Sequence, residues 1–595
     1  MIKRMAWMVL ICLLVIAVAL PSCKPPPEEE AEAPAEGKQT ETGAVAETGA
    51  KDSGTPATSE QEPGEGATEP QYGGTITLST TSVRASFDPP AAKPQGWQIE
   101  LVYNTLMCPD WEKGPAGTGE CLFNSQFYPD DCYRPLLAES WEVIDLETTR
   151  VKLKEGIHFH NKPPVNGREI VADDVVFSLY YHQDHPMSSL YRPEEKDKVR
   201  AVAVDKYTVE FSFSKPDPFE QMHNYGHWLR ILPSEMADMD MENWRNSIGS
   251  GSYFLTDFVP DSSCTYDKNP YYWGKIRING KQYDLPFADT VKVLLIPDRA
   301  TMLSALRVGK IDQQVLNWED AADITASAPA VLTRRVPANY AQSLEFKIDL
   351  EPFDDIKVRK ALSMAIDRQK IIDSYYGGNA EILPWPVRRS GGDIYTPLEA
   401  LPDECRELWE YHPERAKQLL ADAGYATGLK LKLQIPNTTQ YVDLATVVKQ
   451  YWDAIGVETE LDPTESGNFY QILFAHNQTG AVMCAWSNAS PWAFAEWMYR
   501  TGGVWNYSCI KDAWFDAQYD EAREMVDFDQ RNARLKELNL YAMKQCWNTA
   551  LPLEQQIAVW WPWLKNYSGA VGISPNFIQA HYCWVDQDLK ASLMK

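Results

Sequence analysis

Residues 24–70 contain no aromatic side chain and a single large aliphatic one, Val45, among prolines, glutamates, alanines, glycines, threonines and serines. Such a segment buries too little apolar surface to offset the entropy lost on ordering it. We therefore expect an unfolded tether, with the folded part of the 595-residue chain beginning at Tyr72. Because the remainder is too long for one hydrophobic core, two or more domains are expected.

The N-terminus has the pattern of an export signal. A basic stretch around Lys3 precedes an apolar run from Met8 to Leu20, shorter than the roughly 20 residues that a membrane-spanning helix needs. The run ends in Leu-Pro-Ser-Cys at 20–23, which resembles the lipobox of bacterial lipoproteins. This resemblance implies cleavage before Cys23 and lipidation of its thiol, so that the mature protein is anchored to a membrane. An ordinary cleaved signal is the alternative.

Charge and motifs exclude several classes of function. The formal net charge is −27, and no basic stripe is present, so nucleic acid is not an expected partner. The motifs G-x-S-x-G, H-E-x-x-H and the P-loop do not occur, so neither catalysis nor ATP binding is indicated. His223 and His227 have a spacing that can bind metal on a helix, but Gly226 weakens the helix and no third ligand is near. We predict no cofactor and no metal site.

The cysteines indicate disulfides, because the predicted export places the chain in an oxidising compartment. One bridge is expected from a cluster in a Gly- and Pro-rich stretch, Cys108, Cys121 and Cys132. Two further pairs are predicted, Cys484 with Cys509 and Cys546 with Cys583. Spacing alone does not determine the connectivity.

The segment from Cys484 to Cys509, here called the aromatic window, is unusually rich in aromatic residues. These are Trp486, Trp492, Phe494, Trp497, Tyr499, Trp505 and Tyr507. Short hydrogen-bonding side chains, among them Ser487, Asn488 and Asn506, are interleaved with them. Flat apolar faces beside such side chains are typical of small-molecule pockets. We expect the window to form one wall of a ligand cleft; for each ring, packing in the core is the alternative.

Strand and helix patterns alternate along the folded part. Thr75 to Leu78 alternates with a period of two and predicts a strand. In the second half, strand-like segments at Leu429 to Leu433 and Val457 to Leu461 flank a helical pattern from Val442 to Ile455. This order predicts an α/β domain.

Several strings follow one another in an order that is characteristic of one family. They are YGGTITLS from Tyr72, LKEGIHFHNKPPVNGREIVADDVVFSL from Leu153, ALRVGKID from Ala305, VRKALSMAIDRQKII from Val358 and HPERAKQLLADAGY from His412. Together they resemble the bacterial extracellular solute-binding proteins of family 5, the oligopeptide-, dipeptide- and nickel-binding proteins that serve ABC importers. The resemblance covers roughly residues 72–595.

The resemblance implies an α/β, two-lobed periplasmic-binding-protein-like fold of type II, of the large cluster with an extra subdomain. Hinge-linked lobes would close around a ligand in the cleft between them. The expected divisions are a signal peptide at 1–22, a lipidated cysteine and disordered acidic tether at 23–70, lobe one at 71–342 plus 558–595 with the subdomain at about 100–235, and lobe two at 343–557.

The resemblance also suggests how the ligand is bound. In peptide-binding members, the segment aligned with Cys484 to Ser487 carries an acid that pairs with the ligand's α-amino group, but this chain has no Asp or Glu from Met483 to Phe494. Either another carboxylate serves, or the ligand lacks a free amine there. Arg388 and Arg389 could meet a ligand carboxylate. The candidate ligand contacts are Gln95, Trp97, Arg388, Arg389, Trp486, Ser487, Asn488, Trp492, Trp505 and Asn506.

We therefore expect a non-enzymatic, exported lipoprotein that faces the periplasm or the cell exterior. It would act as a monomer, capture a peptide-like solute by lobe closure and deliver it to an ABC permease and its ATPase. An oligosaccharide is the alternative ligand, because tryptophan and asparagine suit sugar rings and some family members bind oligosaccharides. An exported hydrolase or a structural lipoprotein is the alternative from another class.

Overall fold

A computed structural model describes residues 69–81, 86–92, 97–121, 123, 130–188, 190, 199–214, 222–338, 340–383, 389–487, 490–525, 527–569 and 579–595. Residues Thr58–Lys595 form one compact unit, to which the following description applies. The predicted signal and Cys23 lie outside the described residues. Within the described ranges, no helix combines the length and hydropathy that crossing a bilayer requires.

The first sheet contains the predicted N-terminal strand. Its order is β1-β12-β9-β8, with β1 parallel to β12 and the other neighbours antiparallel. The strands are β1 (Thr75–Thr80), β8 (Tyr253–Val259), β9 (Ser263–Lys268) and β12 (Thr290–Leu295). Ile76 and Leu78 point into the core, as the alternating pattern predicts.

Further elements complete this core, which we call the lobe-one core. They are β13 (Gln313–Leu316), α6 (Arg299–Arg307), α7 (Trp318–Ser327), β22 (Leu564–Lys565), α17 (Gln579–Tyr582), β23 (Trp584–Val585) and α18 (Gln587–Leu593). The C-terminal segment thus packs with the N-terminal sheet, and its Trp563 and Trp584 are among the largest fully buried side chains.

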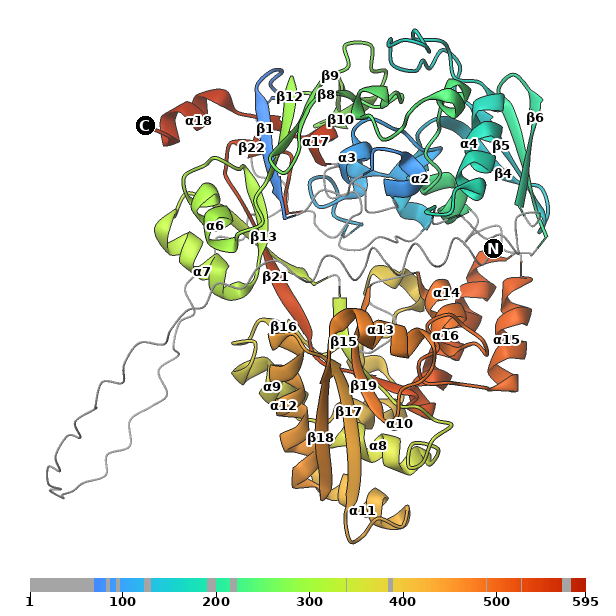
Figure 1. Ribbon diagram of the computed structural model, residues 1–595, viewed down its shortest axis with the longest axis vertical. Helices are drawn as coiled ribbons and strands as arrows, with labels where there is room; N and C mark the ends of the chain where they lie inside the picture. Colours follow the sequence, from blue (N-terminus) through green and yellow to red (C-terminus); the bar gives the residue numbers. More distant parts are fainter. Residues whose placement is uncertain are drawn as a thin grey trace, which may run out of the picture. The chain divides into compact units, whose positions relative to one another are not determined.

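A second, antiparallel sheet has a smaller core of its own. Its order is β4-β5-β7-β6. The strands are β4 (Ala138–Val143), β5 (Thr148–Leu153), β6 (Val199–Asp205) and β7 (Thr208–Phe213), and α4 (Ala172–Asp184) lies beside them (Figure 1). The core forms because alternate strand residues such as Val151 and Phe211 face Val175 and Leu179 of the helix.

Arg168 lies in the segment between β5 and α4, and its side chain connects this segment to α4 and to a short helix farther along the chain. Its guanidinium group donates paired hydrogen bonds to Asp174, at 2.6 and 2.9 Å. It also donates to both carboxylate oxygens of Glu235, at 2.7 Å each. Asp174 lies in the first turn of α4, and Glu235 lies in η5 (Ser234–Asp238). The string from Leu153 that carries much of the resemblance therefore acts here in folding.

The third sheet forms the centre of the lobe-two core. Its order is β18-β17-β19-β15-β20, with β17 parallel to β18 and β19, and β15 antiparallel to β19 and β20. The strands are β15 (Tyr340–Glu345), β17 (Leu429–Pro436), β18 (Val457–Thr464), β19 (Ala481–Ser487) and β20 (Asn548–Ala550). The predicted strands from Leu429 and Val457 are confirmed, and the predicted helix between them begins earlier, at Thr439.

Helices pack around this sheet. They are α8 (Ile356–Met364), α9 (Arg368–Ser374), α10 (Asp403–Arg406), α11 (Pro413–Asp422), α12 (Thr439–Ala454), α13 (Ser466–Phe474), α14 (Pro491–Phe494), α15 (Ala513–Arg523) and α16 (Phe528–Gln545). Trp452 of α12 is fully buried, and its indole N–H donates a 2.9 Å hydrogen bond to the carbonyl of Leu362 in α8. A polar bond in the core thus joins two helices that are far apart in the sequence.

Two strands connect the lobes. β14 (Leu332–Pro337) leads into β15, and β21 (Leu553–Trp560) pairs with β13, β14 and β16 (Ala380–Glu381). Figure 1 shows β21 running from the part that holds β13 to the part that holds β15 and β17. The lobe-one core runs to Val331 and resumes at Ile557, whereas the lobe-two core spans Ala338 to Leu553. The predicted lobe boundaries lie inside β15 and β21 and stay a prediction.

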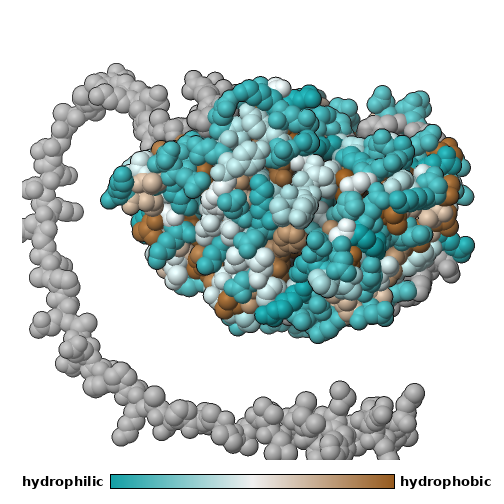
Figure 2. Space-filling view, turned by 90° about the horizontal axis from the view of Figure 1, so that it is seen from above, coloured by the Kyte–Doolittle hydropathy of each residue, from teal (hydrophilic) through white to brown (hydrophobic). Residues whose placement is uncertain are grey.

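The surface agrees with the acidic composition. The face in Figure 2 is mostly hydrophilic, with scattered hydrophobic side chains and no broad apolar patch. Such a surface keeps an exported protein in solution.

The disulfide predictions are partly wrong. The cysteine cluster forms one bridge, Cys121–Cys132, while Cys108 is a buried free thiol. The four cysteines of the other two predicted pairs are also free thiols: Cys484, Cys509, Cys546 and Cys583. Cys546 and Cys583 belong to different cores, which separates them. Cys484 is enclosed in the sheet, whereas the Cys509 sulfur lies 3.8 Å from His476 Nδ1.

Candidate solute-binding site

The aromatic window begins on a central strand of lobe two. Trp486 lies next to the last residue of β19, opposite Ala341 of β15. Its side chain is only 4% exposed. The indole Nε1 donates a 2.9 Å hydrogen bond to Oε1 of Glu345, also on β15. Trp486 is therefore part of the lobe-two core rather than a freely exposed wall residue.

Aromatic contacts extend from Trp486 toward the surface. The Trp486 ring stacks on Tyr507 with centroids 5.0 Å apart and an interplanar angle of 29°. On another side it meets Trp505 at 5.6 Å, and Trp505 makes an edge-to-face contact with Trp497 at 4.7 Å. Trp505 and Trp497 are only partly buried. The exposed aromatic face of the window is therefore formed by these two rings, with Trp486 supporting them.

Glu345 supplies a carboxylate that sequence reasoning missed. It is 2% exposed, and besides the indole it accepts hydrogen bonds from the hydroxyls of Ser343 at 2.6 Å and Ser508 at 3.0 Å. Burial raises the pKa of Glu345, and four neutral side chains, the fourth being that of Asn548, counteract this rise. Its only sequence signal is an acidic residue in an otherwise uncharged strand segment, Tyr340–Glu345.

Two other candidate contacts are occupied by the protein itself. Trp492 packs against Tyr519 at 5.6 Å and under the Arg531 guanidinium at 4.7 Å. The Asn506 amide donates to the carbonyls of Arg500 and Ile510, and its oxygen accepts from the Ile510 N–H. Both of its donors are therefore used within its own loop, which leaves none for a ligand.

The other six candidates lie outside the described residues or are described by their backbone alone. Gln95, Arg388 and Asn488 lie outside the described residues. For three others only the backbone is described: Trp97 begins α3 (Trp97–Glu100), Ser487 ends β19, and Arg389 begins η7 (Arg389–Ile394). Their contacts with a ligand stay predictions.

The histidine pair is described only in part. The backbone of His223 lies in η4 (Met222–His227), while its side chain is outside the description. His227 is 5% exposed, and burial lowers its pKa to about 3, which keeps the ring neutral. Across the described ranges, no group of three His, Cys, Asp or Glu residues could hold a metal ion.

A pocket of about 450 Å³ opens in lobe two. It is formed by α9, β16 and the segment from Tyr395 to Glu399. Its apolar lining comes from Ile372, Ala380, Ile382, Leu383 and Leu398, and its polar lining from Gln369, Asp373, Glu381, Tyr395 and Glu399. Sequence reasoning missed it because these residues, spread over some 30 positions, form no motif.

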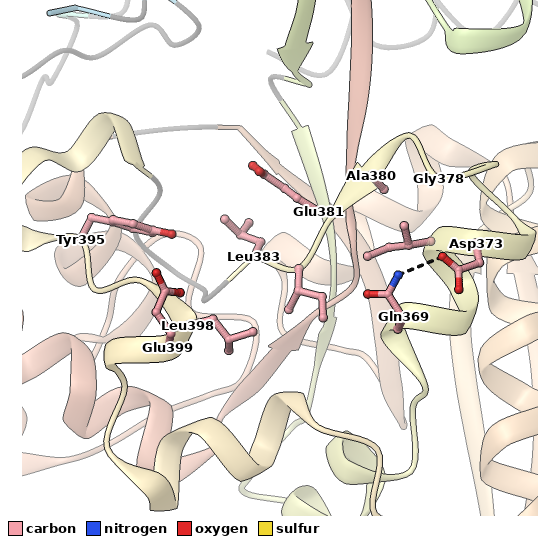
Figure 3. Close-up of a pocket in the computed structure, with 11 residues that line it drawn as sticks. Gln369, Asp373, Gly378, Ala380, Glu381, Leu383, Tyr395, Leu398 and Glu399 are labelled. Carbon is pink, nitrogen blue, oxygen red and sulfur yellow. Dashed lines mark hydrogen bonds between the residues drawn. The ribbon is translucent and has the colours of Figure 1, made fainter. Parts of the chain in front are cut away.

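Figure 3 shows how the polar groups are distributed in the pocket. Tyr395 and Glu399 lie on one side of Leu383, and Gln369 and Asp373 lie on the other, with Glu381 between. The Gln369 amide donates a 2.9 Å hydrogen bond to Asp373, which orients both groups. Among the described residues that line the cavity are three carboxylates and no basic side chain, so this part of the lining favours a ligand group that donates hydrogen bonds or carries positive charge.

Two lobes with separate cores, joined by crossing strands, define the two-lobed fold that solute-binding proteins have. Residues 133–506 match the family model described as bacterial extracellular solute-binding proteins, family 5 Middle. The chain therefore belongs to this family, whose members are binding proteins rather than enzymes.

Individual relatives agree with this assignment. The heme-binding protein A of Haemophilus influenzae is 26% identical over 447 residues, which cover 69% of this chain and 77% of the relative. The dipeptide-binding protein of Escherichia coli is 27% identical over 433 residues, covering 67% and 76%. Among solved structures, HbpA2 from Haemophilus parasuis superposes with a TM-score of 0.69 at 21% identity, covering 86% of this chain and all of that one. The predicted two-lobed fold is confirmed.

Proposed function

We propose that this protein is the receptor of an ABC importer, that it captures a peptide-like solute outside the cytoplasmic membrane, and that it passes the solute to a permease. The observation that carries the proposal is the lobe-two pocket, which is lined by three carboxylates and a tyrosine together with apolar side chains. A peptide offers an ammonium group and apolar side chains, which complement these two kinds of lining.

The pocket also supplies carboxylates of the kind that the segment from Met483 to Phe494 lacks. Glu345 contacts that segment through Trp486, but protein donors already occupy its oxygens. Asp373, Glu381 and Glu399 line an open cavity, and Asp373 accepts a hydrogen bond from Gln369 there. An ammonium group placed there would keep part of its hydration and gain ionic partners, which avoids the cost of a buried unpaired charge.

An oligosaccharide is the second candidate, and the aromatic window favours it. Trp505 and Trp497 present partly exposed rings of the kind on which the apolar face of a sugar can stack. The two candidates differ in charge, because a sugar brings no ammonium group to the pocket.

Anchoring and delivery complete the proposal. A lipid on Cys23 and a flexible segment to residue 70 would hold the folded part near the membrane while leaving it free to reach a permease. The curated relatives include a dipeptide-binding protein and a heme-binding protein, so membership of the family leaves the solute open. Electrophoresis and mass spectrometry of the mature N-terminus would test the anchor, and an unmodified Cys23 would contradict it.

Calorimetry with three probes tests the solute class. The probes are Ala-Ala-Ala, its N-acetylated form, and maltotriose. We expect Ala-Ala-Ala to bind at least tenfold more tightly than the acetylated form, because acetylation removes the positive charge. Glu381→Gln and Glu399→Gln should each lower the affinity for Ala-Ala-Ala severalfold, whereas the exposed control Glu458→Gln should leave this affinity unchanged.

The same experiment shows what would overturn the proposal. Binding of maltotriose without Ala-Ala-Ala would replace the peptide reading with the oligosaccharide reading. Equal affinity for the free and acetylated peptides would remove the pocket's proposed role. Cleavage of either probe during incubation, detected by mass analysis, would indicate a hydrolase and contradict a binding function.

A further inference from the structure

A buried carboxylate joins the two ends of the aromatic window. Oε1 of Glu345 accepts the Trp486 indole N–H at 2.9 Å, on the strand that begins the window. Oε2 accepts the Ser508 hydroxyl at 3.0 Å, close to the end of the window. The two ends are therefore held by one side chain from outside the window, where the sequence suggested a disulfide.

Ser508 is further tied to lobe two, because its hydroxyl also lies 3.1 Å from the carbonyl of Trp547. Tyr507, next to Ser508, stacks on Trp486. Hydrogen bonds and ring stacking thus hold the same two segments together, and the position of Trp505 depends on both. A shift of the Trp486 ring would move Trp505, which it contacts at 5.6 Å, and through it Trp497.

Two acids near this face, Glu345 and Glu496, are already engaged by protein groups. Glu345 is enclosed and occupied by protein donors, as described above. Glu496, the acid within the window, accepts from the Arg523 guanidinium at 3.3 Å. The ring face formed by Trp505 and Trp497 is therefore adjacent to acids that are engaged elsewhere, and a ligand group there gains mainly from stacking.

We infer that Glu345 is a positioning residue, which fixes Trp486 and Ser508 so that Trp505 and Trp497 form a rigid face that binds an uncharged ring of the solute. The ring is an aromatic side chain of a peptide or a sugar ring, since both offer a flat, uncharged face. The inference rests on the proposed solute-binding function, and it assigns to the acid in this region an indirect role instead of an ion pair with the ligand.

The groups packed directly around the Glu345 carboxylate do not ionise in mild acid. Cys484 on β19 and Tyr507 face it, and burial raises the pKa of both groups, so both stay neutral below pH 8. The other groups around the carboxylate, Ser343, Ser508, Trp486 and Asn548, do not titrate in this range. Protonation of Glu345 should therefore weaken its hydrogen bond to Trp486. His476, which lies beside Cys509 at the end of the window, is the nearby histidine, and the Glu345→Gln variant separates its influence on the indole from that of Glu345.

The positioning role can be tested by NMR without any ligand. In protein labelled with ¹⁵N-tryptophan, the Trp486 indole resonance is assigned by its loss in Trp486→Phe. We expect this resonance to move with pH in the wild type, above the ordinary range of a glutamate, and to be displaced and independent of pH in Glu345→Gln. A Trp486 resonance that neither Glu345→Gln nor pH affects would overturn the positioning role.

Binding measurements test the ring face separately. The probes are Ala-Phe-Ala, Ala-Ala-Ala and maltotriose, and the variants are Glu345→Gln, Trp505→Ala and the double variant. We expect Glu345→Gln to lower the affinity for Ala-Phe-Ala or for maltotriose about fivefold or more. The affinity for Ala-Ala-Ala should change by less than about twofold. The double variant should lose little beyond Trp505→Ala alone, because Glu345 acts through the face that Trp505 forms.

Each result has one meaning. A selective loss of Ala-Phe-Ala binding identifies the bound ring as an aromatic side chain of a peptide. A selective loss of maltotriose binding identifies it as a sugar ring. Equal weakening of all three probes, or fully additive effects in the double variant, would overturn the ring-face assignment. If no probe binds the wild type, the proposed function fails, and the NMR titration still decides whether Glu345 positions Trp486. Circular dichroism and thermal melting verify that Glu345→Gln and Trp486→Phe are folded.

Discussion

The indole nitrogen of Trp486 lies 2.9 Å from a carboxylate oxygen of Glu345, and the two residues are 141 positions apart in the sequence. This bond, together with the bond from Ser508, closes the aromatic window. It accounts for how the window can be ordered while Cys484 and Cys509 remain thiols.

The stability of lobe two should depend on this carboxylate. Glu345→Ala leaves the buried indole N–H without its acceptor and removes an acceptor of two hydroxyls, so we expect a loss of about 3 kcal/mol in the free energy of unfolding. Glu345→Gln keeps an acceptor of similar shape and should lose about 1 kcal/mol. Urea denaturation followed by tryptophan fluorescence measures both. A loss below about 1 kcal/mol in the alanine variant would show that the bond contributes little.

The oxidation state of the cysteines is open to direct measurement. Alkylation of the unfolded protein without reductant should modify all seven cysteines that the structure leaves free, and peptide mapping should recover Cys121 linked to Cys132. Adding reductant before alkylation provides the control, since it should add these two cysteines to the modified set. A recovered Cys484–Cys509 link would contradict the structure.

Arg168 should be irreplaceable by lysine. A lysine ammonium cannot donate in fixed pairs to both Asp174 and Glu235, and Asp174 is buried, with a side chain 3% exposed. We expect Arg168→Lys to lower the free energy of unfolding by about 2 kcal/mol. The control is Arg150→Lys, because the ion pair of Arg150 with Glu210 is more exposed. This variant should lower the free energy of unfolding by less than about 0.5 kcal/mol. Similar losses in both variants would contradict a special role for the paired hydrogen bonds of Arg168.

Acid should weaken the protein through buried histidines. His160 is 1% exposed, its Nε2 lies 3.0 Å from the Gly251 carbonyl, and burial lowers its pKa to about 4. The folded state therefore keeps the ring neutral, whereas the unfolded chain takes up a proton below about pH 6.5. The contribution of the neutral ring to the free energy of unfolding is fully present above about pH 6.5, and it is lost as the pH falls toward 4.

The difference between wild type and His160→Gln isolates this effect. We expect the stability advantage of the wild type to shrink by about 1.4 kcal/mol per pH unit between pH 6 and pH 4.5. The exposed control His412→Gln should leave the pH profile of the wild type unchanged. Thermal melting across this range provides the measurement, and a constant difference between wild type and His160→Gln would contradict burial of a neutral ring.

Part of the fold could be predicted from local patterns. Alternation identified the strand from Thr75, and the strand, helix and strand order from Leu429 to Leu461 appears in the structure as β17, α12 and β18. These succeed because side-chain periodicity reflects which face of an element is buried. The cysteine cluster forms one bridge, as expected, but the candidate Cys108 is free and Cys132 is the partner of Cys121. Spacing could not decide this, because Cys108 and Cys132 are about equally close to Cys121 along the chain.

The candidate site was less predictable. The abundance of aromatic residues in the window was correctly noted, yet Trp486, Trp492 and Asn506 are engaged by the protein, and the partly exposed rings are Trp505 and Trp497. Composition cannot distinguish a ring that faces solvent from one that faces a neighbouring strand. Glu345 and the pocket beside β16 were missed because their partners come from elements separated along the chain.

The sequence by itself determined the features that depend on local composition and periodicity, namely the types of many elements and the strings that indicate the family. The export signal and the unfolded tether stay predictions. Tertiary structure alone decided which cysteines meet, which acid accepts the Trp486 indole, and where a cavity remains. The reason is physical, because hydrogen bonds, disulfides and cavities depend on the distances between atoms of remote segments, and those distances are set only when the sheets and helices pack together.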